Sequence, residues 1–324
     1  MSQPEVSVII PVYNEETSLP LLFDRLYPAL DGLGTSYEIL FVNDGSRDRS
    51  AAVLREQFSR RPEATRVVLF GANFGQHMAI LAGFELCRGD IVVTMDADLQ
   101  NPPEEIANLV AKMREGYDYV GTIRRLRQDT AFRRYASRLM NEVRERTTRI
   151  RITDQGCMLR AYSRSVIDAI NSCHEVSTYV PALAYSFAQR PTEIEVAHEE
   201  RAAGTSKYSL YKLMRLNFDL LTGFSEVPLQ LVSMAGMVLS ALSALFVVFL
   251  ALRRIFFGPE AEGLFTLFGI AFFMLGILLF AVGLLGEYVG RIYQQVRHRP
   301  RYLIQAVLES KTAEPAQERE RCEA

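Results

Sequence analysis

Two long apolar segments near the C-terminus place the strongest constraint on how this chain can fold. Residues 229–252 and 264–286 contain no charged side chain, and they are 24 and 23 residues long. About 20 consecutive apolar residues are enough for a helix to cross a bilayer. We therefore expect two transmembrane helices, and this argues against a fully soluble protein.

The short connection between the two spans predicts that they form a hairpin. Residues 253–263 contain the dipeptide Gly258-Pro259, which favours a turn. Four arginines follow the second span within residues 287–301, whereas the connection holds two. Because basic segments tend to stay on the cytoplasmic side, we expect both termini and the tail at residues 287–324 to be cytoplasmic.

The pattern of the first 208 residues is that of a globular α/β domain. Short runs rich in β-branched and aromatic residues occur at residues 6–12, 38–42, 66–70, 91–95 and 117–121. Helical patterns lie between them, at residues 16–33, 49–60, 76–86 and 103–115. This alternation predicts a doubly wound, mainly parallel sheet with its site at the carboxyl ends of the strands.

A basic amphipathic helix is expected within this domain, at residues 124–151. Ten arginines there face three acidic residues, and apolar side chains recur among them at helical spacing. Such a helix is typical of anionic lipid surfaces, although a solvated helix on a soluble domain has the same pattern. The two downstream spans favour the membrane surface, and we expect a second interfacial helix at residues 209–228.

Composition narrows the function classes further. The chain has 36 basic and 38 acidic residues, a net charge of −2, which argues against a nucleic-acid partner. Its four cysteines are scattered without the spacing of a zinc site, so we expect free thiols. Neither the glycine-rich dinucleotide fingerprint nor the P-loop is present.

An acidic pair follows the strand expected at residues 91–95. Asp96 and Asp98 are two residues apart, and Gln100 comes next in step. Oxygen ligands suit Mg²⁺ or Mn²⁺, which keep few protein ligands and share the rest of their coordination with substrate phosphates. Two aspartates at a strand end also occur as a simple turn, so the metal site depends on other groups at the same edge.

Two further strand ends supply such groups. The first strand runs into the polar residues that end at Glu15, and the second into residues 43–46. In a doubly wound sheet these ends converge on one crevice. Residues 43–46 also fit a tight turn in which Gly45 supplies a permissive φ, and both interpretations can hold.

The order of these motifs resembles the GT-A glycosyltransferases of family 2. The matching segments are PVYNE at residues 11–15, DGS at 44–46 and DADLQ at 96–100. With the membrane hairpin, they resemble the polyprenyl-phosphate glycosyltransferases. Residues 73–77, 98–105, 121–122, 127–129 and 156–162 resemble the members that transfer 4-deoxy-4-formamido-L-arabinose to undecaprenyl phosphate for lipid A modification.

The resemblance implies roles for individual residues. The nucleotide of a UDP-sugar would be held by Pro11, Tyr13, Asn14, Glu15, Asp44 and Asp96. Mg²⁺ or Mn²⁺ would be held by Asp96, Asp98 and Gln100. The sugar would contact Gln76 and His77, the acceptor phosphate would meet Arg201 and Lys207, and the catalytic residues would be Asp154 and Asp98.

Simpler roles compete with several of these assignments. Asp154 could cap the following segment, Arg201 and Lys207 could be charges at a membrane rim, and His77 could be structural. One position also departs from the family pattern, which has two acids before Gly45. Here the first is Asn43, and we expect Asp44 to bind the nucleobase.

The chemistry of the acceptor bears on Asp154. A phosphate monoester has a second pKa near 6, so much of the lipid phosphate is already a dianion at cytosolic pH. A nucleophile of this kind needs no general base. We therefore expect Asp154 to orient substrate or stabilise developing positive charge.

These observations favour an inverting, metal-dependent glycosyltransferase in the bacterial inner membrane. Its substrates would be a UDP-sugar and undecaprenyl phosphate, and it would be surrounded by membrane lipid. We also expect a homo-oligomer, and the resemblance implies a tetramer. The first alternative transfers another sugar, such as glucose or mannose, to the same carrier. The second, from another class, is a non-catalytic membrane scaffold that binds nucleotide sugars.

Overall fold

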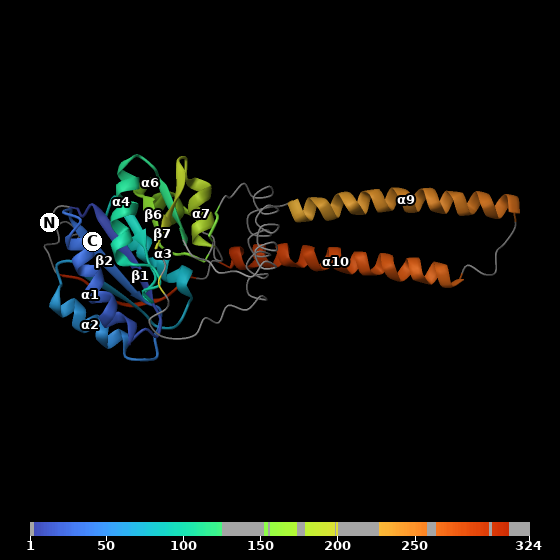
Figure 1. Ribbon diagram of the computed structural model, residues 1–324. Helices are drawn as coiled ribbons and strands as arrows, with labels where there is room; N and C mark the ends of the chain where they lie inside the picture. The colour runs from blue at the N-terminus through green and yellow to red at the C-terminus, as the bar shows by residue number, and fades with distance from the viewer. Residues whose placement is uncertain are drawn as a thin grey trace, which may run out of the picture. The chain divides into compact units, whose positions relative to one another are not determined.

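The computed structural model describes residues 3–124, 152–154, 156–173, 179–197, 199, 227–257, 264–297 and 300–310 (Figure 1). The chain divides into two compact units. The first consists of Met1–Ala136, Ile150–Lys207 and Arg299–Ala324, and the second of Ser137–Arg149 and Tyr208–His298. The interfacial helices expected at 124–151 and 209–228 lie almost wholly outside the described residues.

A mixed sheet forms the centre of the first unit, and its eight described strands follow the order β7-β5-β6-β4-β1-β2-β3-β8. β1 pairs in parallel with β2 and β4, β2 with β3, and β5 with β7. β6 is antiparallel to β4 and β5, and β8 is antiparallel to β3. The strands are β1 Val6–Val12, β2 Tyr37–Asn43, β3 Thr65–Phe70, β4 Ile91–Thr94, β5 Tyr119–Arg124, β6 Arg160–Ser163, β7 Pro191–Val196 and β8 Ile304–Leu308.

Helices cover both faces of this sheet. α1 and α4 contact each other, as do α1 and α2, whereas α3, α6 and α7 contact one another. The helices are α1 Ser18–Asp31, α2 Ser50–Arg60, α3 Gln76–Leu86, α4 Ile106–Arg114, α6 Arg164–Ser172 and α7 Val180–Phe187, with a 3-10 turn at Pro103–Glu105. These two layers confirm the predicted α/β class.

The core explains why the first half of the chain forms these elements. The β-branched residues of β1 are almost all fully buried, as expected for a central parallel strand covered on both faces. On α1, Leu19, Leu22, Leu26 and Leu30 recur at helical spacing, and all four are buried in the same apolar cluster. Local pattern and tertiary packing therefore agree.

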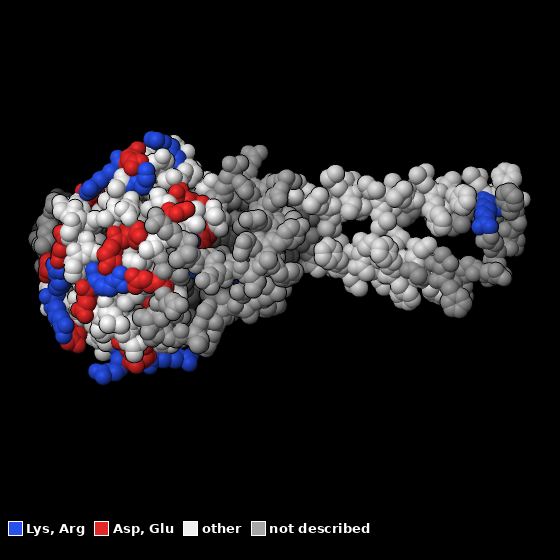
Figure 2. Space-filling model, in the orientation of Figure 1, with Lys and Arg blue, Asp and Glu red and all other residues white. Residues whose placement is uncertain are grey.

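The second unit contains two long apolar helices, α9 Val227–Phe257 and α10 Leu264–Val296. Within α10, Ile270–Tyr293 is long and apolar enough to cross a membrane, with a mean hydropathy of 2.3. Among the described residues of α9, the apolar stretch is Leu229–Leu239. Acidic and basic side chains are mixed over the visible face of the sheet domain, whereas the described atoms along α9 and α10 are almost free of charge (Figure 2).

Candidate functional site

One edge of the sheet collects the polar strand ends. β1, β2, β4 and β5 all end at this edge, because they run parallel to one another through their neighbours. β6 is antiparallel to β4, with Thr94 opposite Arg160, so the loop before β6 reaches the same edge. The sheet therefore brings Asp96, Asp98 and Asp154, predicted from distant parts of the sequence, to one edge.

Asp96 has the most strongly perturbed carboxyl group at this edge. Burial raises the pKa of Asp96 to about 7, and the neighbouring Asp98 and Glu15 carboxylates raise it as well. Two neighbours oppose this rise. The side-chain amide of Gln76 donates a hydrogen bond to Asp96 at 2.5 Å, and the positive charge of Arg124 also lowers the pKa of Asp96. These carboxylates repel one another in a partly buried position, and a bound cation would relieve that repulsion.

The acidic pair fits a divalent cation that shares its coordination with phosphates. No group of three histidine, cysteine or acidic side chains with metal-binding geometry occurs among the described residues. Mg²⁺ and Mn²⁺ are commonly held by one or two carboxylates and completed by substrate oxygens. Asp98 also accepts a hydrogen bond from the backbone N–H of Gln100 at 3.1 Å, which fixes the turn after β4.

Asn14 and Glu15 are held in the turn that follows β1. Asn14 has a φ of 56°, a left-handed conformation that asparagine tolerates better than most residues. Its backbone N–H donates to Ser46 Oγ at 3.0 Å, and Ser46 in turn donates to Asn43 Oδ1 at 2.5 Å. Asn43 therefore supports the shape of this turn.

Asp44 has a clear structural role. It is buried, and its carboxylate accepts hydrogen bonds from the backbone N–H groups of Phe74 at 2.6 Å and Gly75 at 2.8 Å. The side-chain amide of Asn73 donates to it at 2.9 Å. Burial raises the pKa of Asp44, while the two backbone hydrogen bonds oppose that shift. A contact with the nucleobase stays a prediction.

Asp154 is paired with a residue that the motif analysis did not identify. Arg124, at the end of β5, donates from Nε to Asp154 Oδ2 at 2.6 Å and from its terminal nitrogen to Oδ1 at 2.8 Å. The side chain of Asp154 is 5% exposed and that of Arg124 is 20% exposed. A Cβ on Gly156 would lie 2.7 Å from Arg124, so glycine leaves the space that the guanidinium occupies.

A second arginine lies beneath this pair. Arg160 is fully buried and donates to the backbone oxygens of Asp154 at 2.7 Å and Cys157 at 2.9 Å, as well as to the Tyr119 hydroxyl. Arg160 therefore fixes the loop that carries Asp154. It was missed because a single arginine in a segment with no predicted strand gives no signal of its own; only its hydrogen-bonding partners show its role.

His77 lies on the same side of the sheet, at the start of α3. Its ring packs edge-on against Tyr179 at 5.2 Å, and burial together with Arg160 lowers the pKa of His77 to about 4. Nδ1 is buried and has no hydrogen-bond partner among the described residues. A neutral imidazole at physiological pH is consistent with both a structural role and a sugar contact.

The remaining predicted residues are less informative. Pro11 lies within β1 and is half-buried, whereas the Tyr13 side chain is 41% exposed. Arg201 and Lys207 lie outside the described residues. The assignment of these residues to nucleotide or acceptor stays a prediction.

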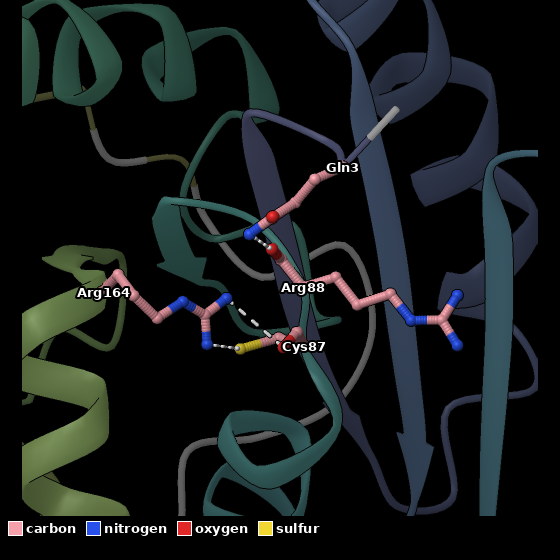
Figure 3. A pocket seen from close by; sticks show the side chains of 4 residues that line it. All are labelled: Gln3, Cys87, Arg88 and Arg164. Carbon is pink, nitrogen blue, oxygen red and sulfur yellow. Dashed lines mark hydrogen bonds between the residues drawn. The ribbon is translucent and has the colours of Figure 1, made fainter. Parts of the chain in front are cut away.

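A pocket of about 420 Å³ lies elsewhere in the first unit, lined by Gln3, Cys87, Arg88 and Arg164 (Figure 3). Gln3 precedes β1, Cys87 and Arg88 precede β4, and Arg164 begins α6 directly after β6, so the pocket belongs to the opposite edge of the sheet. Arg164 donates to the backbone oxygens of Cys87 and Gly89. The Arg88 guanidinium points away from Arg164 in Figure 3 and pairs with Glu309. The pocket is therefore separate from the acidic edge.

The comparison with known families agrees with this geometry. The family model described as "Glycosyl transferase family 2" matches residues 7–170, just over half of the chain. The matched range includes the ends of β1, β2, β4 and β5 as well as Asp154. The chain belongs to glycosyltransferase family 2.

Curated relatives within this family match nearly the whole chain. An undecaprenyl-phosphate 4-deoxy-4-formamido-L-arabinose transferase of Shewanella sediminis (strain HAW-EB3) is 51% identical over 94% of this chain and 92% of its own. The transferase of the same name from Edwardsiella ictaluri (strain 93-146) is 52% identical over 97% of both chains. The mannosyl-3-phosphoglycerate synthase structure from Rubrobacter xylanophilus overlaps 67% of this chain and 72% of its own, at 16% identity and a TM-score of 0.48.

Proposed function

We propose that this family 2 glycosyltransferase transfers 4-deoxy-4-formamido-L-arabinose from its UDP derivative to undecaprenyl phosphate. The observation that carries the proposal is the identity of about 50% over nearly the full length of relatives that bear this name. The acidic edge around Asp96 and Asp98 supports the donor half of the reaction. A membrane-associated protein suits the lipid acceptor.

The donor would bind across the ends of β1, β2 and β4. Asp96 and Asp98 would hold Mg²⁺ or Mn²⁺ against the pyrophosphate, and Pro11, Tyr13, Asn14, Glu15 and Asp44 would surround the nucleoside. When bound, the ion neutralises the charge of the departing diphosphate. Gln76 holds the carboxylate of Asp96 from the side of α3.

Asp154 would act as an orienting and electrostatic group. Its carboxylate accepts two hydrogen bonds from Arg124, a bidentate arrangement that fixes the orientation of the carboxylate. The acceptor phosphate is a dianion in large part at neutral pH, so it attacks the anomeric carbon without losing a proton. One in-line displacement of this kind inverts the anomeric centre, since no covalent nucleophile is assigned. Arg201 and Lys207 would pair with the acceptor phosphate.

The proposal includes a membrane hairpin formed by α9 and α10, with both termini in the cytoplasm of a bacterial inner membrane. It also includes a homo-oligomer, for which a tetramer is the family expectation. Cross-linking in native membranes, followed by mass determination, tests the oligomer. Accessibility of single cysteines placed at residues 258–263 to an impermeant thiol reagent tests the hairpin.

The reaction is tested directly with purified full-length enzyme in detergent. UDP-4-deoxy-4-formamido-L-arabinose and undecaprenyl phosphate should give UDP and a lipid-linked sugar in the presence of MnCl₂ or MgCl₂, and EDTA should abolish turnover. Asp98→Asn should lose at least about 100-fold in activity, since it removes a charged ligand of the ion. Glu104→Gln, at an exposed position, is a matched control.

A panel of donors separates the proposal from its alternatives. Faster turnover with UDP-glucose or a UDP-hexosamine would replace the proposed sugar while keeping the acceptor. UDP binding without release of product from any donor would indicate a non-catalytic scaffold.

A further inference from the structure

The segment that follows α10 packs against the loop that carries part of the donor site. We define the C-terminal segment as residues 300–309 and the donor loop as residues 71–76. β8 of the C-terminal segment pairs antiparallel with β3, from Val67 opposite Leu308 to Phe70 opposite Ile304. The pairing continues past the strand, because the backbone N–H of Gly71 donates to the carbonyl oxygen of Leu303 at 3.2 Å.

Three aromatic rings join the two segments. Tyr302 stacks on Phe70 with ring centroids 5.1 Å apart and planes 8° from parallel. Phe70 then meets Phe74 edge-on, at 5.8 Å and 84°. Phe70 is 3% exposed, so the middle ring of this chain is fixed by the core.

The donor loop contacts two of the acidic residues proposed for the donor, Asp44 and Asp96. The backbone N–H groups of Phe74 and Gly75 donate to Asp44, and Gln76 donates to Asp96. Gly45, next to Asp44, packs so closely on the donor loop that a Cβ there would lie 2.4 Å from the carbonyl carbon of Ala72. A shift of the donor loop would therefore move both carboxylates.

The other end of the C-terminal segment is tied down by charge. Glu309 pairs with Arg66 at 3.0 Å and with Arg88 at 2.9 Å. At its beginning, Arg301 donates to the backbone oxygen of Cys173. The segment is thus anchored on both sides of Tyr302, and it starts a few residues after the end of α10 at Val296.

We infer that the C-terminal segment is a positioning element of the donor site, acting through Tyr302, Phe70 and Phe74 on the donor loop. This inference rests on the proposed function, because it takes the acidic edge as the binding site for a UDP-sugar. It assigns to residues beyond the membrane helices a role in donor affinity, although they touch none of the proposed donor ligands directly.

The test replaces the outer ring in the full-length enzyme. Tyr302→Ala removes the stack, whereas Tyr302→Phe keeps the ring. Burial and the neighbouring Glu85 raise the pKa of the Tyr302 hydroxyl. Tyr302→Phe removes this hydroxyl but keeps the ring that stacks on Phe70, so the affinity for UDP should not change. Leu303→Ala is the matched control, because its side chain is 63% exposed and its hydrogen bond is made by the backbone.

Affinity for UDP with MnCl₂ is measured by calorimetry, and steady-state kinetics give separate KM values for donor and acceptor. Tyr302→Ala should raise the Kd for UDP and the donor KM about tenfold, the upper end of what one aromatic pair contributes. Its kcat and acceptor KM should stay within about twofold of wild type, as should every parameter of the two controls. If Tyr302→Ala fails to fold, Tyr302→Leu keeps the apolar volume without the flat ring.

A double variant distinguishes positioning from general loosening. If Tyr302 acts through Phe74, Tyr302→Ala combined with Phe74→Ala should bind UDP no more weakly than the weaker single variant. Additive losses, or equal losses in donor and acceptor KM, would overturn the inference. If Tyr302→Ala bound UDP as tightly as wild type, the inference would fail but the proposed function would stand. If the wild-type enzyme itself did not bind UDP, the proposed function would fail as well.

Discussion

Replacing Arg124 should destabilise this protein more than replacing its partner Asp154. Removing one member of a buried ion pair costs about 3–5 kcal/mol, because the other charge stays in a poorly solvated position. Arg124→Gln would deprive the nearly buried Asp154 carboxylate of two hydrogen bonds at 2.6 and 2.8 Å, so we expect a loss of about 3 kcal/mol. Asp154→Asn keeps an acceptor oxygen, and the guanidinium is 20% exposed, so we expect about 1–2 kcal/mol.

The assay is thermal unfolding of the full-length enzyme in detergent. The chain has no tryptophan, but Cys87 and Cys157 are buried and become reactive toward a fluorogenic thiol reagent on unfolding. For a folded unit of about 150–250 residues, 3 kcal/mol corresponds to a fall in Tm of about 6–12 °C. Arg60→Gln is the matched control, because its pair with Glu56 is exposed and contributes less than about 1 kcal/mol.

The double variant Arg124→Gln/Asp154→Asn decides whether the ion pair is the cause. With both charges removed, it should recover at least half of the Tm lost in Arg124→Gln, and yet its turnover should stay as low as that of Asp154→Asn. A Tm of Arg124→Gln within 2 °C of wild type, or a double variant no more stable than Arg124→Gln, would refute the reasoning.

Three further predictions concern other parts of the first unit. Gly45→Ala should lower stability by at least about 2 kcal/mol and weaken UDP binding, because φ is +62° and the new Cβ would meet Ala72 at 2.4 Å; thermal unfolding and calorimetry check this. Since the pKa of His77 is lowered to about 4 from 6.5, its neutral form favours folding and stability is lost as pH falls below 6.5. The free energy of unfolding of the wild type, relative to that of His77→Gln, should therefore fall by about 2 kcal/mol between pH 7.5 and pH 5. A difference in the free energy of unfolding that does not change with pH would contradict this. Glu38→Gln should lower the free energy of unfolding by about 3 kcal/mol, because the buried carboxylate accepts hydrogen bonds from three donors. Glu309, whose side chain is 43% exposed, is the comparison: Glu309→Gln should lower it by less than about 1 kcal/mol in the same assay.

The fold could be predicted from the sequence because its strands and helices carry strong local signals. The strand expected at residues 6–12 and the helix expected at residues 76–86 have the observed bounds of β1 and α3. The helix expected at residues 103–115 begins instead as a 3-10 turn, with Pro103 in its first position, and continues as α4 from Ile106. β6, β7 and β8 were not predicted, because none of them is a continuous run of buried apolar residues like those of the central parallel strands.

The site could be predicted only where a motif follows a strand directly. Asp96 and Asp98 could be placed because they immediately follow an apolar run. Arg124 and Arg160 could not, because their roles depend on pairing between β4, β5 and β6, which no local pattern specifies. Asp44 shows the same limit: its position at a strand end was predictable, but its three hydrogen bonds from the donor loop were not.

The position of β8 in the sheet also bears on the membrane segment. The chain leaves the sheet unit after Lys207 and rejoins it at Arg299, and β8 then pairs with β3 in the same sheet as β1. A chain that starts and ends on one side of a membrane crosses it an even number of times. If α10 crosses the membrane as proposed, a second crossing is required between these points, and the 31 residues of α9, about 46 Å of helix, are long enough to provide it. The pairing of β3 with β8 therefore supports the proposed hairpin over a single span, whatever the orientation of the protein.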